Sequence, residues 1–384
     1  MAGLYIHIPF CESRCIYCGF YSTTSLQLRD DYVAALCREM ELRPREKALG
    51  CNEPIQTIYL GGGTPSMLSG RQLEKIFQSV QKNYVSDFSG MEITMECNPD
   101  DVTEDFCQTI AMLPVNRISM GAQTFSEDRL HFLRRRHHAE DVCLAVQRLR
   151  SAGIQNISID LMFGFPGETL EDWENDILEA LHLQVEHISA YSLMYEEGTP
   201  LYRLLENGKI DEIDEELSLQ MYETLCNKLK EAGYEHYEIS NFALPGYRSR
   251  HNSSYWNEVP YIGIGAAAHS YKRSPKEISR SWNVENLQGY ISSVSEGKRP
   301  SECEILDITT RYNDLITTAL RTKDGINLLR MKKEFGDTFV RRLQTEAQDK
   351  IKRGLMEFSD GRLHLTKAGI FISDDIMGDF MIVE

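Results

Sequence analysis

Three cysteines stand within eight residues, in the segment CESRCIYC at 11–18. Cys11, Cys15 and Cys18 follow a C-x3-C-x2-C spacing and offer three thiolate ligands. A structural zinc site needs four ligands, usually from two CxxC pairs, and the sequence has no second pair. An iron–sulfur cubane takes one ligand per iron, so three thiolates leave one iron open to a small molecule. We interpret the segment as a cluster loop, with zinc as the alternative.

An open iron suits a particular chemistry. It can chelate an amino acid through its amino and carboxylate groups, as S-adenosylmethionine chemistry requires. One electron from the cluster then cleaves the sulfonium and releases a 5′-deoxyadenosyl radical. In such systems the cofactor carries the reaction, and the protein supplies placement and electronics.

Polar or glycine-rich residues stand at the ends of five successive predicted strands. The first strand runs into the cysteine loop, the second into GGGTP at 61–65, and the next three carry Glu96, Gln123 and Asp160. Each feature alone is also compatible with an ordinary turn or a structural hydrogen bond. Because active sites lie at the C-terminal ends of parallel strands, their common placement predicts one shared pocket.

Short β-rich runs alternate with amphipathic segments of helical length. We predict strands at 4–8, 55–60, 91–97, 116–121, 157–163 and 187–193, and helices near 28–47, 69–83, 103–112, 126–151 and 169–183. Such repeated units imply a parallel sheet with right-handed crossovers. About six units are fewer than the eight of a full TIM barrel, so a partial barrel and a doubly wound open sheet both fit. No glycine-rich dinucleotide fingerprint follows the first strand, which disfavours a nicotinamide-binding Rossmann fold.

The sequence pattern changes near residue 300. The remaining segment is mostly helical, and LMEFSDGRLHLT predicts a hairpin turned at Asp360–Gly361. We therefore expect two domains: a barrel with an extension over 1–300, and a smaller, winged-helix-like domain over 301–384.

Composition excludes several function classes. The chain of 384 residues carries a net charge of −17, which makes it a poor general binder of nucleic acid. Its basic stretch, RRRHH at 134–138, is equally typical of a solvated helix end. No apolar run is long enough to span a bilayer, and the N-terminus lacks the pattern of a signal peptide, so we expect a cytoplasmic protein. The remaining cysteines stand singly and are typical of small core residues in a reducing compartment.

The motifs resemble those of the radical S-adenosylmethionine superfamily. The cysteine loop, Tyr17 just before the third cysteine, and GGGTP all match. Over essentially the whole chain, YIHIPFCESRCIYC, YLGGGTPS, MECNPDD, RISMGAQTF and SIDLMFGFPGET are similar to the oxygen-independent coproporphyrinogen III dehydrogenase (HemN) group. The resemblance implies a partial (β/α)6 barrel with a C-terminal accessory domain.

The same resemblance implies roles for individual residues. The three cysteines would bind a [4Fe–4S] cluster. Tyr5, Gly62, Gly63, Thr64 and Glu96 would contact S-adenosylmethionine. Gln123, Arg135 and Asp160 would correspond to a second S-adenosylmethionine site, which makes Arg135 a candidate carboxylate partner.

Two features differ from the true dehydrogenase and match the HemW-type haem chaperone branch, and a third fits a motif of that branch. The first predicted strand begins at residue 4, without the dehydrogenase's N-terminal extension. Phe20 stands where the dehydrogenase has a further cysteine. RHNSSYW at 250–256 fits the HNxxYW motif of the branch. In that motif His251 offers an imidazole ligand for haem iron, and Tyr255 and Trp256 offer ring surfaces, although a buried aromatic cluster is an equal alternative. His269, in GIGAAAHS, is a second haem candidate.

Three functional hypotheses follow. The first is a haem chaperone that holds haem, a cluster and S-adenosylmethionine and delivers haem to acceptor haemoproteins, such as those of the respiratory chain. The second is radical decarboxylation of coproporphyrinogen III in porphyrin biosynthesis. The third, radical modification of RNA, is disfavoured by the negative charge. Whether the chain is an enzyme, and whether it forms a homodimer, stays open.

Overall fold

A curved sheet of twelve strands forms the centre of the chain in the computed structural model, which describes residues 1–383 apart from the side chain of Glu46. Glu384, the last residue of the predicted domain 301–384, lies outside the described residues. The first six strands are parallel and lie side by side in chain order. They are β1 (Ala2–Ile8), β2 (Ile55–Gly62), β3 (Glu92–Cys97), β4 (Arg117–Gln123), β5 (Asn156–Phe163) and β6 (His187–Ser192). All six predicted strands are therefore confirmed.

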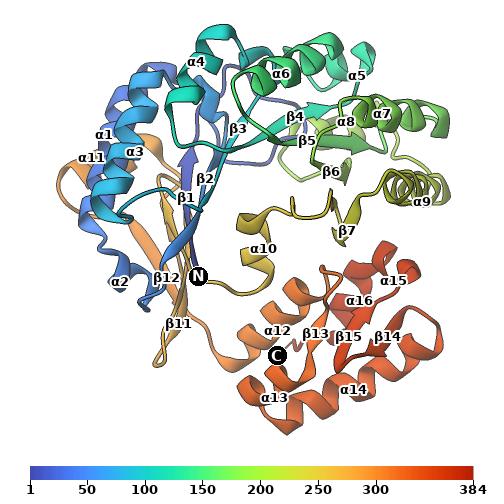
Figure 1. Ribbon diagram of the computed structural model, residues 1–384. Helices are drawn as coiled ribbons and strands as arrows, with labels where there is room; N and C mark the ends of the chain where they lie inside the picture. The colour runs from blue at the N-terminus through green and yellow to red at the C-terminus, as the bar shows by residue number, and fades with distance from the viewer. Residues whose placement is uncertain (384) are drawn as a thin grey trace.

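Helices cover the convex outer side of this sheet (Figure 1). They are α1 (Arg29–Leu42), α2 (Arg45–Leu49), α3 (Gly70–Asn83), α4 (Glu104–Met112), α5 (Glu127–Phe132), α6 (Ala139–Ser151) and α7 (Leu170–His182), with short 3₁₀ turns η1 (Leu26–Leu28), η2 (Pro65–Met67) and η3 (Pro99–Asp101). A doubly wound sheet reverses its strand order and carries helices on both faces. Neither holds here, so the partial barrel is the correct alternative.

The helix predicted over 126–151 is wrong in one respect, because two helices replace it. α5 ends at Phe132 and α6 begins at Ala139. Between them Arg134 adopts a φ of 60°, which a continuing helix does not allow. The resulting turn points Arg135 back to the sheet, where its Nη2 donates to the carbonyl of Gly121 at 2.7 Å.

Further strands extend the sheet beyond the six-strand core. On one side β9 (Tyr261–Ile264) pairs in parallel with β1, and β10 (His269–Arg273), β11 (Ile278–Asn283) and β12 (Ser301–Ile305) follow as antiparallel neighbours. On the other side lie β8 (Asn241–Ala243) and β7 (Glu235–Glu238). The connecting helices are α8 (Pro200–Glu206), α9 (Glu215–Glu231), α10 (Arg250–Trp256) and α11 (Leu287–Ser295). Helix α10, which carries the HNxxYW motif, lies between the curved sheet and the C-terminal elements (Figure 1).

The C-terminal elements have a hydrophobic core of their own, which includes Tyr312, Leu343 and Phe380. They are α12 (Ile308–Ala319), β13 (Ile326–Asn327), α13 (Leu328–Phe335), α14 (Asp337–Lys352), β14 (Met356–Ser359), β15 (Arg362–Leu365), α15 (Lys367–Phe371) and α16 (Ser373–Phe380). The predicted hairpin is confirmed as β14–β15, with positive φ at both Asp360 and Gly361. The boundary after residue 300 stays a prediction, and β12 beyond it still pairs with the large sheet.

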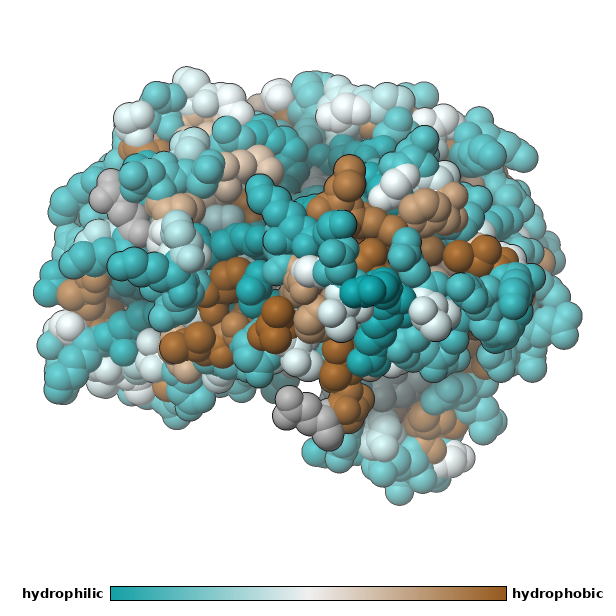
Figure 2. Space-filling model, turned by 90° about the horizontal axis from the view of Figure 1, so that it is seen from below, coloured by the Kyte–Doolittle hydropathy of each residue, from teal (hydrophilic) through white to brown (hydrophobic). Residues whose placement is uncertain are grey.

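The surface seen from below is largely hydrophilic, with hydrophobic residues in separate small patches (Figure 2). Such scattered apolar exposure is normal for a folded domain. None of the helices in the described part of the chain combines the length and the hydropathy needed to cross a membrane.

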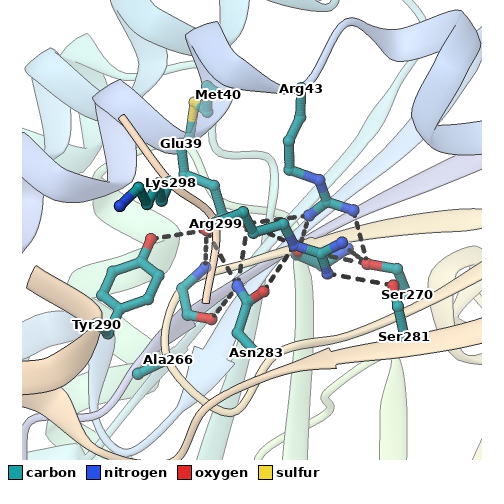
Figure 3. A network of polar contacts seen from close by, with 12 residues as sticks. Glu39, Met40, Arg43, Ala266, Ser270, Ser281, Asn283, Tyr290, Lys298 and Arg299 are labelled. Carbon is teal, nitrogen blue, oxygen red and sulfur yellow. Dashed lines mark hydrogen bonds and ion pairs between the residues drawn. The ribbon is translucent and has the colours of Figure 1, made fainter. Parts of the chain in front are cut away.

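A buried polar network ties α1 to the extension of the sheet, as Figure 3 shows. Glu39 is fully buried at its centre and forms ion pairs with Arg43 and Arg299. Its Oε2 also accepts hydrogen bonds from Tyr290 and from the backbone N–H of Gly265. The network therefore fixes the segment between β9 and β10, which leads directly to His269.

Candidate functional site

The cysteine loop follows β1 and is held by backbone hydrogen bonds. The N–H of Cys11 donates to the carbonyl of Thr23 at 2.9 Å, and the N–H of Thr23 donates to that of Pro9 at 2.6 Å. The side chains of Cys11, Cys15 and Cys18 are half-buried and line one pocket, which we call the cysteine pocket. Burial raises the pKa of the Cys11 and Cys18 thiols.

In a site for a single metal ion, the donor side chains converge on one point. Among the described residues, no three His, Cys, Asp or Glu side chains are grouped as ligands of one metal ion. A cubane distributes its thiolates over different irons, so its cysteines do not converge on one point.

The GGGTP turn packs the end of β2 against the cysteine loop. Gly62 has a φ of 114°, and a β-carbon there would lie 2.4 Å from the His7 ring. A β-carbon on Gly63 would lie 2.8 Å from the backbone of Pro9. Only glycine fits either position, because any side chain would push the loop away. Thr64 then donates from its hydroxyl to the Cys11 sulfur at 3.5 Å.

Two carboxyl groups, Glu96 on β3 and Asp160 on β5, face the cysteine pocket. Glu96 accepts from the Tyr59 hydroxyl at 2.7 Å and from the N–H of Gly62 at 3.0 Å. Burial raises the pKa of Glu96 to about 7 and that of Asp160 to about 6. Both groups therefore change protonation state near neutral pH.

Gln123 and Arg135 complete the predicted wall. A β-bulge in β4 gives Gln123 a φ of 67° and still turns its side chain into the pocket. The structure thus brings ten predicted residues together in one pocket: Cys11, Cys15, Cys18, Gly62, Gly63, Thr64, Glu96, Gln123, Arg135 and Asp160.

The sequence interpretation missed several pocket residues, among them Asn98, Ser119 and Gly121. Ser119 and Gly121 stand two residues apart in β4, before the bulge that shifts Gln123. Side chains alternate between the faces of a strand, so this spacing is a signal that identifies the inward face. Asn98 stands directly after Glu96 and Cys97, at the end of β3.

Tyr5 and His269 line a neighbouring cavity, which we call the aromatic pocket. Its lining is Tyr5, His7, Gly19, Phe20, Tyr21, Tyr255, Tyr261, Ala267, His269 and Glu285. The Tyr5 hydroxyl hydrogen-bonds to His7 Nδ1 at 2.9 Å. Phe20, whose side chain is 72% exposed, lines both pockets and connects them.

His251 lies buried behind Tyr59 and Tyr255, and both of its ring nitrogens have partners. Nδ1 hydrogen-bonds to Thr57 Oγ1 and Nε2 to the Tyr255 hydroxyl, each at 2.9 Å. Burial, assisted by the charge of Arg117, lowers the pKa of His251 to about 3, so its ring is neutral. In this conformation neither nitrogen is free to bind iron.

His269 has a different setting. Its side chain is exposed, and its ring stacks on Trp282 with 5.9 Å between centroids. Unlike His251, it is accessible to a ligand in the aromatic pocket.

Comparison with known proteins identifies the family. Residues 5–180 match the model of the radical SAM superfamily, and residues 306–372 match that of the HemN C-terminal domain. Heme chaperone HemW of Bacillus subtilis is 35% identical over 385 residues, which cover 99% of each chain. The chain belongs to the HemW family of radical SAM proteins. Heme chaperone HemW of Lactococcus lactis is 33% identical, over 98% of this chain and 97% of the relative.

A solved structure supports the fold. Coproporphyrinogen III oxidase (HemN) from Escherichia coli superposes with a TM-score of 0.84, covering 99% of this chain and 89% of that one, at 20% identity. The resemblance inferred from the motifs is therefore confirmed, both for the family and for the barrel with its C-terminal domain.

Family membership implies a [4Fe–4S] cluster and S-adenosylmethionine, and the cysteine pocket fits both. Three thiols on one wall are the donors that such a cluster needs. Beside Cys15, Arg135 Nε is buried and has no hydrogen-bond partner among the described residues, so one donor is left for a ligand. Glu96 offers an acceptor for a cationic group.

Proposed function

We propose that this protein binds haem in the aromatic pocket and passes it to acceptor haemoproteins, with the cluster and S-adenosylmethionine held in the cysteine pocket. The observation that carries the proposal is the pair of adjoining pockets that share Phe20, in a chain related over its whole length to proteins named heme chaperones. The two pockets would place haem next to a redox cofactor.

In the cysteine pocket, Cys11, Cys15 and Cys18 would be the cluster ligands. Glu96 would accept from the amino group of S-adenosylmethionine, and Gly62, Gly63 and Thr64 would line its site. Gln123, Arg135 and Asp160 face the same pocket, so a second S-adenosylmethionine would have to share it. A bound cluster with S-adenosylmethionine supplies one-electron cleavage of the sulfonium.

We expect S-adenosylmethionine binding to weaken as the pH falls. The raised pKa of Glu96, about 7, means that the carboxyl is largely protonated at pH 6 and largely ionised at pH 8. The ionised carboxylate is the stronger acceptor for the amino group, so affinity at pH 6 should be lower than at pH 8, by up to about tenfold. Calorimetric titration at both pH values measures the difference. In Glu96→Gln the pH dependence should disappear. If the variant keeps it, another group is responsible.

The aromatic pocket has the surfaces that a porphyrin needs. Phe20, Tyr21, Tyr255 and Tyr261 offer rings to a flat apolar macrocycle, and His269 offers an imidazole. The alternative ligand His251 would first have to break its hydrogen bonds to Thr57 and Tyr255. Geometry therefore favours His269 as the axial ligand.

We expect His269→Ala to weaken haemin binding at least tenfold and to shift the Soret band of the complex. The imidazole–iron bond is the specific contact, while stacking contributes the rest. Haemin titration of the full chain, followed by absorbance, checks this. His182→Ala, at an exposed histidine that ends α7, is the matched control and should bind as the wild type does. Loss of binding in His251→Ala alone, in protein that is still folded, would instead identify His251 as the ligand.

Delivery of haem to an acceptor protein is tested separately. Haem-loaded protein with a reconstituted cluster is mixed with an apo-haemoprotein, and transfer is followed by the spectrum of the acceptor. Failure of transfer with binding intact would leave a haem-binding protein that is not a chaperone. Anaerobic conversion of coproporphyrinogen III to protoporphyrinogen would overturn the proposal in favour of the decarboxylase.

A further inference from the structure

Arg135 contacts a cysteine of the loop directly. It comes from the turn between α5 and α6, and its Nη1 donates to the Cys15 sulfur at 3.5 Å. Its Nη2 donates to Asn98 Oδ1 and to the carbonyl of Gly121, both at 2.7 Å. These three contacts fix the plane of the guanidinium against the cysteine loop.

The charge of Arg135 is not neutralised by a direct partner. Its acceptors are a side-chain amide, a carbonyl and a sulfur, and among the described residues no carboxylate forms an ion pair with it. Its neighbour Arg136 differs, because it forms ion pairs with Glu12, Asp100 and Asp101. Within the described part of the chain, Arg135 thus has no carboxylate in direct contact, and the Cys15 sulfur is one of its three direct acceptors.

We propose that Arg135 sets the reduction potential of the cluster, in addition to any contact with S-adenosylmethionine; this rests on the proposed function. One-electron reduction, by an external low-potential donor, adds one negative charge to the cluster and its sulfurs. A fixed cation and an N–H···S hydrogen bond stabilise that added charge and so favour the reduced state. Hydrogen bonds to cluster sulfurs are among the main determinants of the potential.

Geometry makes arginine specific for this position. A lysine ammonium is a point charge on a flexible stem and does not hold a sulfur, an amide and a carbonyl in one plane. Arg135→Lys therefore keeps the charge but loses the planar set of hydrogen bonds, whereas Arg135→Gln removes the charge.

The test is an anaerobic redox titration of the reconstituted full chain with dithionite, followed by electron paramagnetic resonance. Arg135→Gln should lower the equilibrium constant for reduction at least tenfold, which is about 59 mV for a one-electron couple. Arg135→Lys should lie between this variant and the wild type. Arg134→Gln, which removes an exposed charge one residue away, should match the wild type.

Iron and sulfide analysis measures how much cluster each variant holds, so that a change in potential can be told from a loss of cluster. If Arg135→Gln assembles too little cluster, Asn98→Ala retains the arginine but removes one of the two acceptors of its Nη2, and a smaller shift in the same direction is expected. A variant with a full cluster and an unchanged potential would overturn the inference and leave the proposed function intact. A wild-type chain that assembles no cluster would overturn the cofactor assignment and the inference with it.

Discussion

Replacing Glu39 with alanine should lower the free energy of unfolding by about 3–5 kcal/mol, the usual cost of removing one partner from a buried ion pair. Glu39 is fully buried and is the shared partner of Arg43 and Arg299. Without it, two guanidinium groups lie close together in the interior with no carboxylate between them. Burial and the neighbouring Arg43 already lower the pKa of Arg299 to about 10, which indicates how costly its charge is there.

Urea denaturation of the full chain, followed by circular dichroism, measures this change. Glu41→Ala is the matched control, because Glu41 lies on the same helix and pairs with Arg38 and Lys82 at the surface. Exposed ion pairs contribute little, so this variant should unfold close to the wild type. Equal midpoints for the two variants would show that the network does not stabilise the fold.

Loss of Glu39 should also affect ligand binding in the aromatic pocket. The carboxylate accepts from the N–H of Gly265, and Arg43 donates to the carbonyl of Gly263 and to Ser270. These contacts, two to the backbone and one to the Ser270 hydroxyl, lie on either side of His269. We therefore expect haemin affinity to fall in Glu39→Ala under conditions where the protein is still folded.

The second large effect concerns the cysteine loop. Cys15→Ser should reduce the iron bound after anaerobic reconstitution to less than about a tenth of the wild-type amount, because each protein thiolate of a cubane holds a different iron. Two remaining protein ligands leave two irons open. The alcohol of serine is a harder and far less acidic ligand than a thiol.

Iron and sulfide content, together with the visible absorption of the cluster, measure the outcome. Cys143→Ser, at an exposed cysteine on α6 outside the pocket, should assemble a complete cluster. Cys15→Ser should also lose the N–H···S contact with Arg135, so any residual cluster should differ in potential as well. A full complement of iron in Cys15→Ser would mean that another residue supplies the ligand.

Local sequence signals predicted much of this protein. The C-x3-C-x2-C spacing predicts the candidate ligands, and the structure places the three cysteines in one pocket because neighbouring residues of one loop must lie close together. The Asp360–Gly361 turn and the helix start at Thr169 are likewise local, since each depends on the φ of one or two residues or on one side chain bonding its own backbone. The six core strands follow from β-rich runs that alternate with amphipathic helices.

Other features depended on contacts between distant segments. RRRHH at 134–138 was equally compatible with a solvated helix end. Only the left-handed turn at Arg134 directs Arg135 onto Cys15, which lies 120 positions away in the chain. Tyr5 matched a motif for S-adenosylmethionine contact, yet the sheet register places it with His7 in the aromatic pocket.

The two candidate haem ligands, His251 and His269, also show how much depends on tertiary contacts. Their types and motifs made both candidates for haem iron, with the HNxxYW motif favouring His251. Thr57 of β2 occupies one nitrogen of His251 and Tyr255 of α10 itself occupies the other, whereas the segment held by the Glu39 network leaves His269 accessible. The sequence alone thus determined which chemical groups are present and which backbone units carry them. Tertiary structure decided which of those groups are free, because burial and hydrogen bonding depend on residues far away in the chain.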